Sequence, residues 1–173
     1  MMPRKPARLP FDPYAILAAL EEQRTAYVLI GALARVIEAS DEITLGLDLT
    51  PSTRPENLRR LDLALAAINA RRPDGRAPEL EQTDFDRGPV VELQTDHGEV
   101  KVVPFPEGTR GYDDLRRAAI REPLGRGLRP SVASPADLAR MLSALGREED
   151  IPKLLMMRRL IELDRSQGRS IER

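Results

Sequence analysis

The chain has 173 residues, 41% of them hydrophobic, which is enough for one ordinary domain with a substantial core. It has no cysteine and a single histidine, His97, which excludes disulfides, thiolate metal sites and histidine clusters. A net charge of -1 and an aromatic content of 3% exclude a protein that coats nucleic acid by bulk charge and base stacking. The basic N-terminus is not followed by an apolar stretch of signal-peptide or membrane-spanning type, so we expect a cytoplasmic protein without membrane contact.

The first predicted elements are a helix, a strand and a second helix. Asp12-Pro13 has the N-cap and first-position residues of a helix, which we expect to run to about Arg24. Tyr27 to Ala34 indicates a short apolar strand that breaks at Gly31 into a helix ending near Ala39. The N-terminus of such a helix can present backbone N–H groups to a phosphate.

The next segment, residues 43–50, alternates with the period of a half-buried strand. The residues expected to face the core are Ile43, Leu45, Leu47 and Leu49, and those on the other face are Thr44, Gly46, Asp48 and Thr50. Carboxylates at positions 46 and 48 would lie side by side and could hold a hard divalent cation through oxygen ligands. Only Asp48 is present, so the segment resembles an Asp-x-Asp pair without its first member.

A third helix and a hairpin follow. Thr53 to Glu56 has the spacing of a capping box, and one face of the helix is apolar through Leu58, Leu61, Leu65 and Ile68. Residues 89–95 and 99–105 flank the turn Asp96-His97-Gly98 and are predicted to form a hairpin. Lys101 then lies on its second strand, with Glu99 on the same face.

The C-terminal third is predicted to be mainly helical. A short helix is expected over 112–121, followed by an irregular link over 123–132 with a possible short strand. Ser134-Pro135-Ala136-Asp137 repeats the capping signature before another helix, and a last helix is expected from Glu148 to Ser166, ending near Gly168. Alternating helices and strands favour an α+β fold, a small mixed sheet covered by helices.

The order of these motifs resembles the nucleotidyltransferase superfamily, particularly small bacterial proteins related to minimal nucleotidyltransferases and the AbiEii type of toxin. The corresponding residues here are Gly31-Ala32 for a Gly pair, Ala39-Ser40 for Gly-Ser, Gly46-x-Asp48 for Asp-x-Asp, and Glu56-Asn57-Leu58. Further similarity lies in 98–103, 108–115 and 133–138, with Gly146-Arg147 and Asp150. The family's third carboxylate falls on Lys101, so two of three expected metal ligands are missing.

This resemblance implies a single domain over 1–173, with a nucleotidyltransferase-like core at 27–105 and a mainly helical extension at 106–173. It implies a protein that has lost metal-dependent transfer and binds a nucleotide, RNA or a partner protein. Two alternatives stay open. One is an active nucleotidyltransferase that uses Mg²⁺ and a nucleoside triphosphate to modify RNA or protein, and the other is a toxin–antitoxin component that acts by association.

Candidate site residues follow from the same comparison. Asp48 is the metal ligand, although we expect no resident cofactor and weak metal binding at most. If the protein is active, Asp48 and Glu99 are the catalytic pair, with Asp41 and Glu42 as weaker candidates because they precede the strand.

Gly31, Ser40 and Lys101 are the candidate nucleotide-binding residues. Lys101 has three interpretations: an exposed lysine, a phosphate-binding cation, or an internal substitute for the metal that pairs with Asp48. A separate basic run is an alternative phosphate or RNA contact, and consists of Arg116, Arg117, Arg121, Arg126 and Arg129.

Overall fold

A computed structural model describes residues 10–38, 40 and 42–171 and shows a six-stranded mixed sheet with helices on both sides. The strands are β1 (Tyr27–Ile30), β2 (Gly46–Pro51), β3 (Val91–Thr95), β4 (Gly98–Val102), β5 (Ile120–Arg121) and β6 (Ser131–Val132). The helices are α1 (Pro13–Glu22), α2 (Gly31–Ile37), α3 (Pro55–Ala67), α4 (Tyr112–Leu115), α5 (Pro135–Leu145) and α6 (Ile151–Ile171), with short 3₁₀ turns between some of them.

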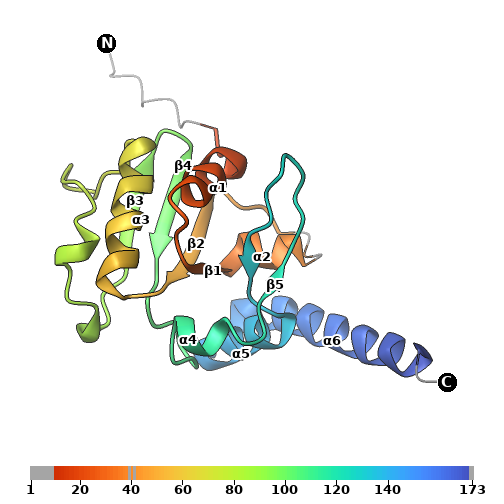
Figure 1. Ribbon diagram of the computed structural model, residues 1–173. Helices are drawn as coiled ribbons and strands as arrows, with labels where there is room; N and C mark the ends of the chain where they lie inside the picture. Colours follow the sequence, from red (N-terminus) through yellow and green to blue (C-terminus); the bar gives the residue numbers. More distant parts are fainter. Residues whose placement is uncertain (1–9, 39, 41, 172–173) are drawn as a thin grey trace, which may run out of the picture.

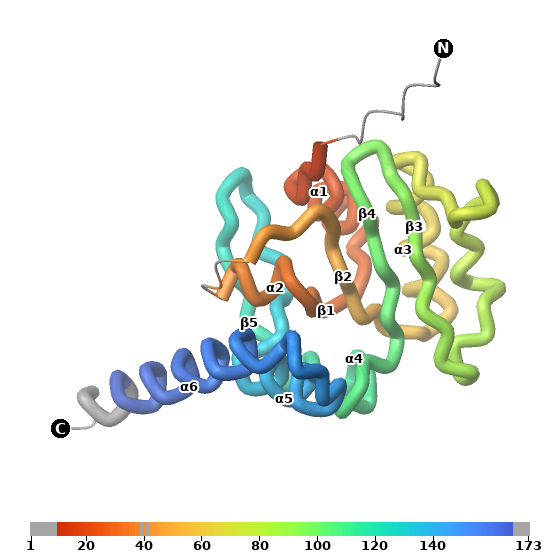
Figure 2. Tube along the Cα trace, turned by 180° about the vertical axis from the view of Figure 1, so that it is seen from behind, coloured from red at the N-terminus to blue at the C-terminus, as the bar shows by residue number. Residues whose placement is uncertain are grey.

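The sheet has the order β3-β4-β2-β1-β6-β5. Strand β2 runs antiparallel to β1 and parallel to β4, and the β3–β4 hairpin closes one edge. Helices α1 and α3 cover one face of β2, β3 and β4 (Figure 1). On the opposite face α2 packs against β2, whereas none of the helices in the described part of the chain covers β3 and β4 (Figure 2). This uncovered area is where the cleft described below lies.

Much of the core lies between the sheet and helices α1 and α3, and the predicted alternation is confirmed at Leu47 and Leu49 but not at Ile43 and Leu45. Leu47 and Leu49 on β2 are completely buried, as are Ile16 and Leu20 on α1. The apolar face predicted for the third helix is confirmed, since all four of its named residues are buried. At about 25 cal/mol per Å² of apolar surface, this burial is the main source of folding free energy.

Side-chain caps and one amide clamp fix how the elements connect. The Asp12 carboxylate accepts a hydrogen bond from Ala15 N, and the Ser134 hydroxyl accepts one from Asp137 N, as predicted. Asn57 on α3 is buried; its amide donates to the carbonyls of Ala26 and Ser52 and accepts from Ala26 N. Asn57 thereby ties the start of β1 to the end of β2.

The two hairpin strands are shorter than the predicted 89–95 and 99–105, since they cover only Val91–Thr95 and Gly98–Val102. Four further predicted boundaries are wrong. Strand β2 begins at Gly46, because its pairing with β1 ends at Asp48 and its pairing with β4 ends at Gly46, so residues 43–45 pair with neither strand. Consequently Ile43 is 92% exposed and Leu45 57% exposed, instead of facing the core. Helix α3 starts at Pro55 with Arg54 as N-cap and no side-chain cap, so Thr53 does not form the predicted capping box.

The other two differences concern the C-terminal third. The helix expected over 112–121 ends after one turn at Leu115, since Ile120 and Arg121 pair with β6. The last helix continues through Gly168 to Ile171, because a glycine weakens a helix without necessarily ending it. The short strand expected in the link is confirmed as β6.

Strand β6 also pairs with β1, so the sheet extends past the predicted core boundary at residue 105, and the division into core and extension stays a prediction. Helix α2 ends at Ile37, and Ala39, Asp41 and the basic segment at residues 1–6 lie outside the described residues. Within the described chain, none of the helices combines the length and apolar character that crossing a bilayer requires.

Candidate functional site

A cleft of about 250 Å³ lies on the uncovered face of β2, β4 and β3, beside the start of α2. The strand register builds its floor, because paired residues on neighbouring strands share a face. Asp48 lies opposite Lys101, which in turn lies opposite Glu92. Two residues nearer the start of β2, Gly46 lies opposite Glu99, which in turn lies opposite Gln94. All six residues line the cleft.

The Asp48 carboxylate is half-buried and has no hydrogen-bond or ion-pair partner within the described chain. Burial raises the pKa of Asp48 above its usual value, and the charges of Lys101 and Arg35 lower it only in part. The carboxylate rests against the backbone of Gly31, where the chain turns from β1 into α2 at a φ of +72°. A Cβ at position 31 would collide with Oδ2 of Asp48, so this turn requires glycine.

Of the three interpretations of Lys101, the one in which it pairs with Asp48 is wrong. Lys101 Nζ lies 3.8 Å from Oε1 of Glu92, directly across the β3–β4 hairpin, and does not reach ion-pair distance of Asp48. The Lys101 side chain is 44% exposed and its long stem carries the ammonium toward solvent, whereas Asp48 is turned down against Gly31. Since exposed ion pairs contribute little, the pair between Lys101 and Glu92 adds little to stability.

Gly46 has a structural role that the sequence comparison did not reveal. A Cβ built at this position would lie 2.9 Å from the backbone carbonyl oxygen of Glu99 on β4. The two strands therefore approach too closely for a side chain at position 46. An aspartate at position 46 could be accommodated only if β4 moved.

Glu99 and Glu92 are the other carboxylates of the cleft. Gln94 Nε2 donates to Oε1 of Glu99 at 2.9 Å, which orients it over the floor. Glu92 is the residue that sequence reasoning missed; a two-residue turn at Asp96-His97 places it opposite Lys101, so counting the hairpin register could have found it. Among the described residues, no group of three or more histidine, aspartate or glutamate side chains has an arrangement that could hold a metal ion.

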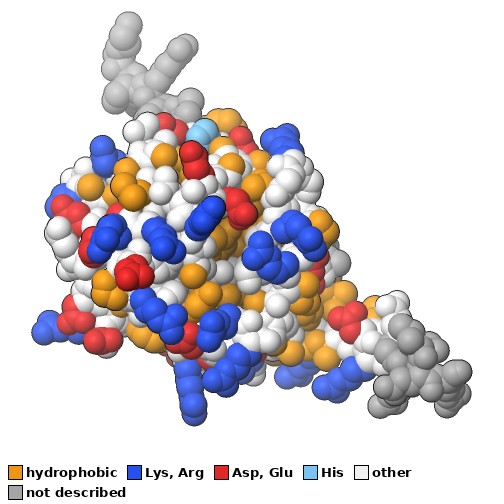
Figure 3. Space-filling model, in the orientation of Figure 1, with side chains coloured by type: hydrophobic (Ala, Val, Ile, Leu, Met, Phe, Trp, Pro, Cys, Tyr) orange, Lys and Arg blue, Asp and Glu red, His pale blue; other side chains and the backbone are white. Residues whose placement is uncertain are grey.

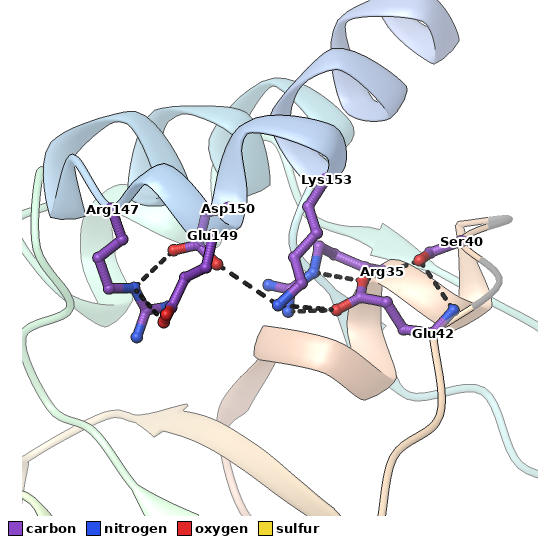
Figure 4. A network of polar contacts seen from close by, with 7 residues as sticks. All are labelled: Arg35, Ser40, Glu42, Arg147, Glu149, Asp150 and Lys153. Carbon is purple, nitrogen blue, oxygen red and sulfur yellow. Dashed lines mark hydrogen bonds and ion pairs between the residues drawn. The ribbon is translucent and has the colours of Figure 1, made fainter.

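Ser40 does not line the cleft but belongs to a polar network beside it (Figure 4). Its hydroxyl donates to Oε2 of Glu42 at 2.8 Å. Arg35 on α2 donates to both Glu42 oxygens, at 2.6 and 2.8 Å, and the two side chains are only 11% and 14% exposed. Burial raises the pKa of Glu42, but the hydrogen bonds from Arg35 and Ser40 outweigh it and hold the pKa below its usual value.

The network continues to the end of the chain through Lys153 on α6. Its ammonium lies 3.6 Å from Glu42 and 3.4 Å from Asp150. Asp150 is almost completely buried and also accepts a hydrogen bond from Arg147 at 2.6 Å. The downstream residues Arg147 and Asp150 of the family comparison therefore anchor the start of α6 next to Arg35, whose positive charge acts on Asp48.

A second carboxylate near α2 predicts a pH dependence. Glu38 has a pKa raised from 4.5 to about 7 by burial and by the neighbouring carboxyl groups of Glu122 and Asp164. Between these two values the folded state holds a proton that the unfolded state has released, so stability falls as pH rises. We expect the wild type to lose unfolding free energy from about pH 4.5 to about pH 7. Glu38→Gln should lose less unfolding free energy over that pH range, as measured by urea unfolding at each pH. Equal pH slopes for the wild type and the variant would refute this prediction.

Comparisons with known proteins identify the fold but not a family. No protein-family model matches the chain, and no curated protein matches its sequence. The structure of a candidate nucleotidyltransferase from Thermotoga maritima superposes with a TM-score of 0.54, covering 82% of this chain and 86% of that chain at 14% identity. The antibiotic-resistance factor ANT(2'')-Ia superposes with a TM-score of 0.54, covering 92% and 90% of the two chains at 15% identity. The six-stranded mixed sheet and its helices thus form a nucleotidyltransferase-like fold.

Proposed function

We propose that this protein is a nucleotide-binding module on a nucleotidyltransferase-like fold that no longer carries out metal-dependent transfer. The observation that carries the proposal is Lys101, which occupies the floor of the cleft in register with Asp48. Nucleotidyl transfer depends on metal ions that neutralise the phosphates, and carboxylates must hold those ions. An ammonium at this position repels a divalent cation and attracts a phosphate directly.

The remaining cleft residues support a ligand of low negative charge. Lys101 would contact a phosphate, while the carboxylates of Glu99 and Asp48 can accept hydrogen bonds from ribose hydroxyls or a base amino group. Three carboxylates and one ammonium line the cleft, so a monophosphate suits it better than a triphosphate. Ser40, whose hydroxyl is engaged by Glu42, would have to exchange that partner to contact the ligand.

Calorimetric titration tests this proposal. We expect AMP to bind the wild type equally well with and without Mn²⁺, and to bind Lys101→Ala about tenfold more weakly or worse, since a charge-assisted contact is lost. Arg60→Ala is the matched control, because Arg60 is an exposed cation on α3, which packs on the opposite face of the sheet. Binding that requires Mn²⁺, or that Lys101→Ala leaves unchanged, would contradict the proposal.

The second candidate is an active nucleotidyltransferase, and the observation that favours it is the set of carboxylates lining the cleft. Asp48 with Glu99, or with Glu92, would bind Mg²⁺ together with a nucleoside triphosphate and transfer the nucleoside monophosphate to RNA or protein. In that case ATP binding would need the metal, and Asp48→Asn would abolish transfer to an acceptor.

A third candidate is a partner-binding role of the toxin–antitoxin type. It is favoured by two exposed apolar side chains, Ile43 and Leu45, of which Leu45 also lines the cleft. The finer kinship with minimal nucleotidyltransferases and AbiEii-type toxins belongs to this proposal, and it is supported by the retained Glu56-Asn57-Leu58 motif.

A further inference from the structure

A second pocket, with a volume of about 440 Å³, lies at the end of the sheet away from the cleft, between the loop after β4, helix α4 and helix α5. The residues that matter here are three arginines, Arg110, Arg117 and Arg140, and two aspartates, Asp113 and Asp114. No residue of this pocket lines the cleft around Asp48. A ligand here would therefore be bound independently of the proposed nucleotide site.

The pocket has a rigid wall. Arg140 on α5 donates to Asp114 at 3.1 Å and to Asp137 at 3.0 Å, so its guanidinium is fixed in place. Asp114 also accepts from the backbone N–H of Arg110 at 2.9 Å, which holds the loop against α4. This backbone bond, with the charges of Arg140 and Arg117, keeps the pKa of Asp114 below its usual value. The wall is thus held in one arrangement before any ligand arrives.

Two of the arginines that line this pocket are available to bind a ligand. Arg110 and Arg117 are exposed, and within the described chain neither guanidinium has an ion-pair partner. Asp113, the carboxylate nearest to solvent, is already shared by Arg54 at 3.8 Å and Arg116 at 3.4 Å.

The pocket and its surroundings are net positive. The pocket itself is lined by three guanidinium groups, from Arg110, Arg117 and Arg140, and by two carboxylates, from Asp113 and Asp114. Glu107 lies on the same loop but does not line the pocket. Figure 3 shows the same bias, since basic side chains gather along the lower edge of the molecule, where α4 lies. This excess stands out in a chain whose net charge is -1.

We infer that this pocket binds a phosphate group through Arg110 and Arg117. A guanidinium presents two parallel N–H donors that match the oxygens of a phosphate, and two such groups at one concave site give both charge and geometry. Arg140, held by its aspartates, defines the back of the site. The phosphate could belong to a nucleic-acid strand or to a free nucleotide, and the two sources differ in their salt dependence and in size.

The test compares three probes, a single-stranded oligoribonucleotide, ATP and inorganic phosphate, by fluorescence anisotropy or calorimetry at several salt concentrations. Arg110→Ala/Arg117→Ala should weaken binding of the phosphate-bearing probe by about tenfold or more, and for the oligoribonucleotide should reduce the salt slope by about 1.4. Arg158→Ala/Arg159→Ala removes the same charge from exposed positions of α6 and should change neither value. Lys101→Ala separates the two sites, because it should affect the cleft alone.

Each outcome is informative. Loss of oligoribonucleotide binding in the pocket variant, with ATP binding unaffected, assigns the phosphate to a nucleic-acid strand. Loss of ATP or inorganic phosphate binding in that variant, but not in Lys101→Ala, assigns it to a free phosphate compound. If the wild type binds none of the three probes, or the pocket variant and the α6 control behave alike, the inference is overturned whatever the state of the cleft.

Discussion

Gly31→Ala is expected to lower the free energy of unfolding by roughly 2 to 4 kcal/mol, combining a left-handed backbone cost with a steric collision. The residue has a φ of +72°, which an alanine adopts only under strain. In addition, the new Cβ would strike Oδ2 of Asp48 and would lie only 3.1 Å from the Cβ of that residue, so the Asp48 side chain would have to shift. Urea unfolding followed by circular dichroism measures the change.

A glycine elsewhere separates the two causes. Gly75 has a φ of +87° but nothing within 4 Å of the position its Cβ would take, so Gly75→Ala should pay only the backbone cost of about 1 to 2 kcal/mol. Asp48→Ala should recover part of the loss in Gly31→Ala and none of the loss in Gly75→Ala, since coupling requires contact. If Gly31→Ala and Gly75→Ala cost the same, Asp48 does not lie against the turn as described.

Arg35→Ala should also be strongly destabilising, by about 3 kcal/mol, because it leaves the nearly buried Glu42 carboxylate without its bidentate partner. Lys153 and Ser40 remain near Glu42 and limit the loss. Thermal and urea unfolding measure it.

An exposed pair provides the control. Arg76 and Asp74 are joined at 2.7 Å, but their side chains are 61% and 54% exposed, so Arg76→Ala should destabilise the protein far less than Arg35→Ala. The double variant Arg35→Leu/Glu42→Leu should be more stable than Arg35→Ala alone, because it leaves no unpaired charge. An Arg35→Ala protein as stable as Arg76→Ala would show that the network does not hold α2 in place.

Local patterns in the sequence were sufficient for much of the fold. The period of two placed Leu47, Asp48 and Leu49 correctly on β2, and the polar turn at Asp96-His97 located the hairpin. Capping residues located the starts of α1 and α5. These signals come from interactions between residues close in sequence, so the local pattern contains all the residues that cause the structure.

What the sequence could not supply was information about distant neighbours. Leu45 alternates correctly with Leu47, yet it is exposed because it precedes the first paired residue of β2. One interpretation paired the Lys101 ammonium with Asp48, but the ammonium lies within ion-pair distance of Glu92 on β3 instead. Gly46 appeared to be a lost carboxylate, whereas the close approach of Glu99 makes it a packing requirement as well. Each depends on strand register and spacing across the sheet.

The Mn²⁺ arm of the calorimetric titration tests the proposed loss of metal-dependent chemistry most directly. Lys101→Asp removes the ammonium and places a carboxylate in register with Asp48 and Glu92, without the crowding that an aspartate at position 46 would cause. We expect no detectable heat of Mn²⁺ binding for the wild type at millimolar metal, and clear binding for Lys101→Asp that is lost again in Lys101→Asp/Asp48→Asn. Wild-type protein that binds Mn²⁺ and loses it in Asp48→Asn would contradict this account and establish the cleft as a working metal site.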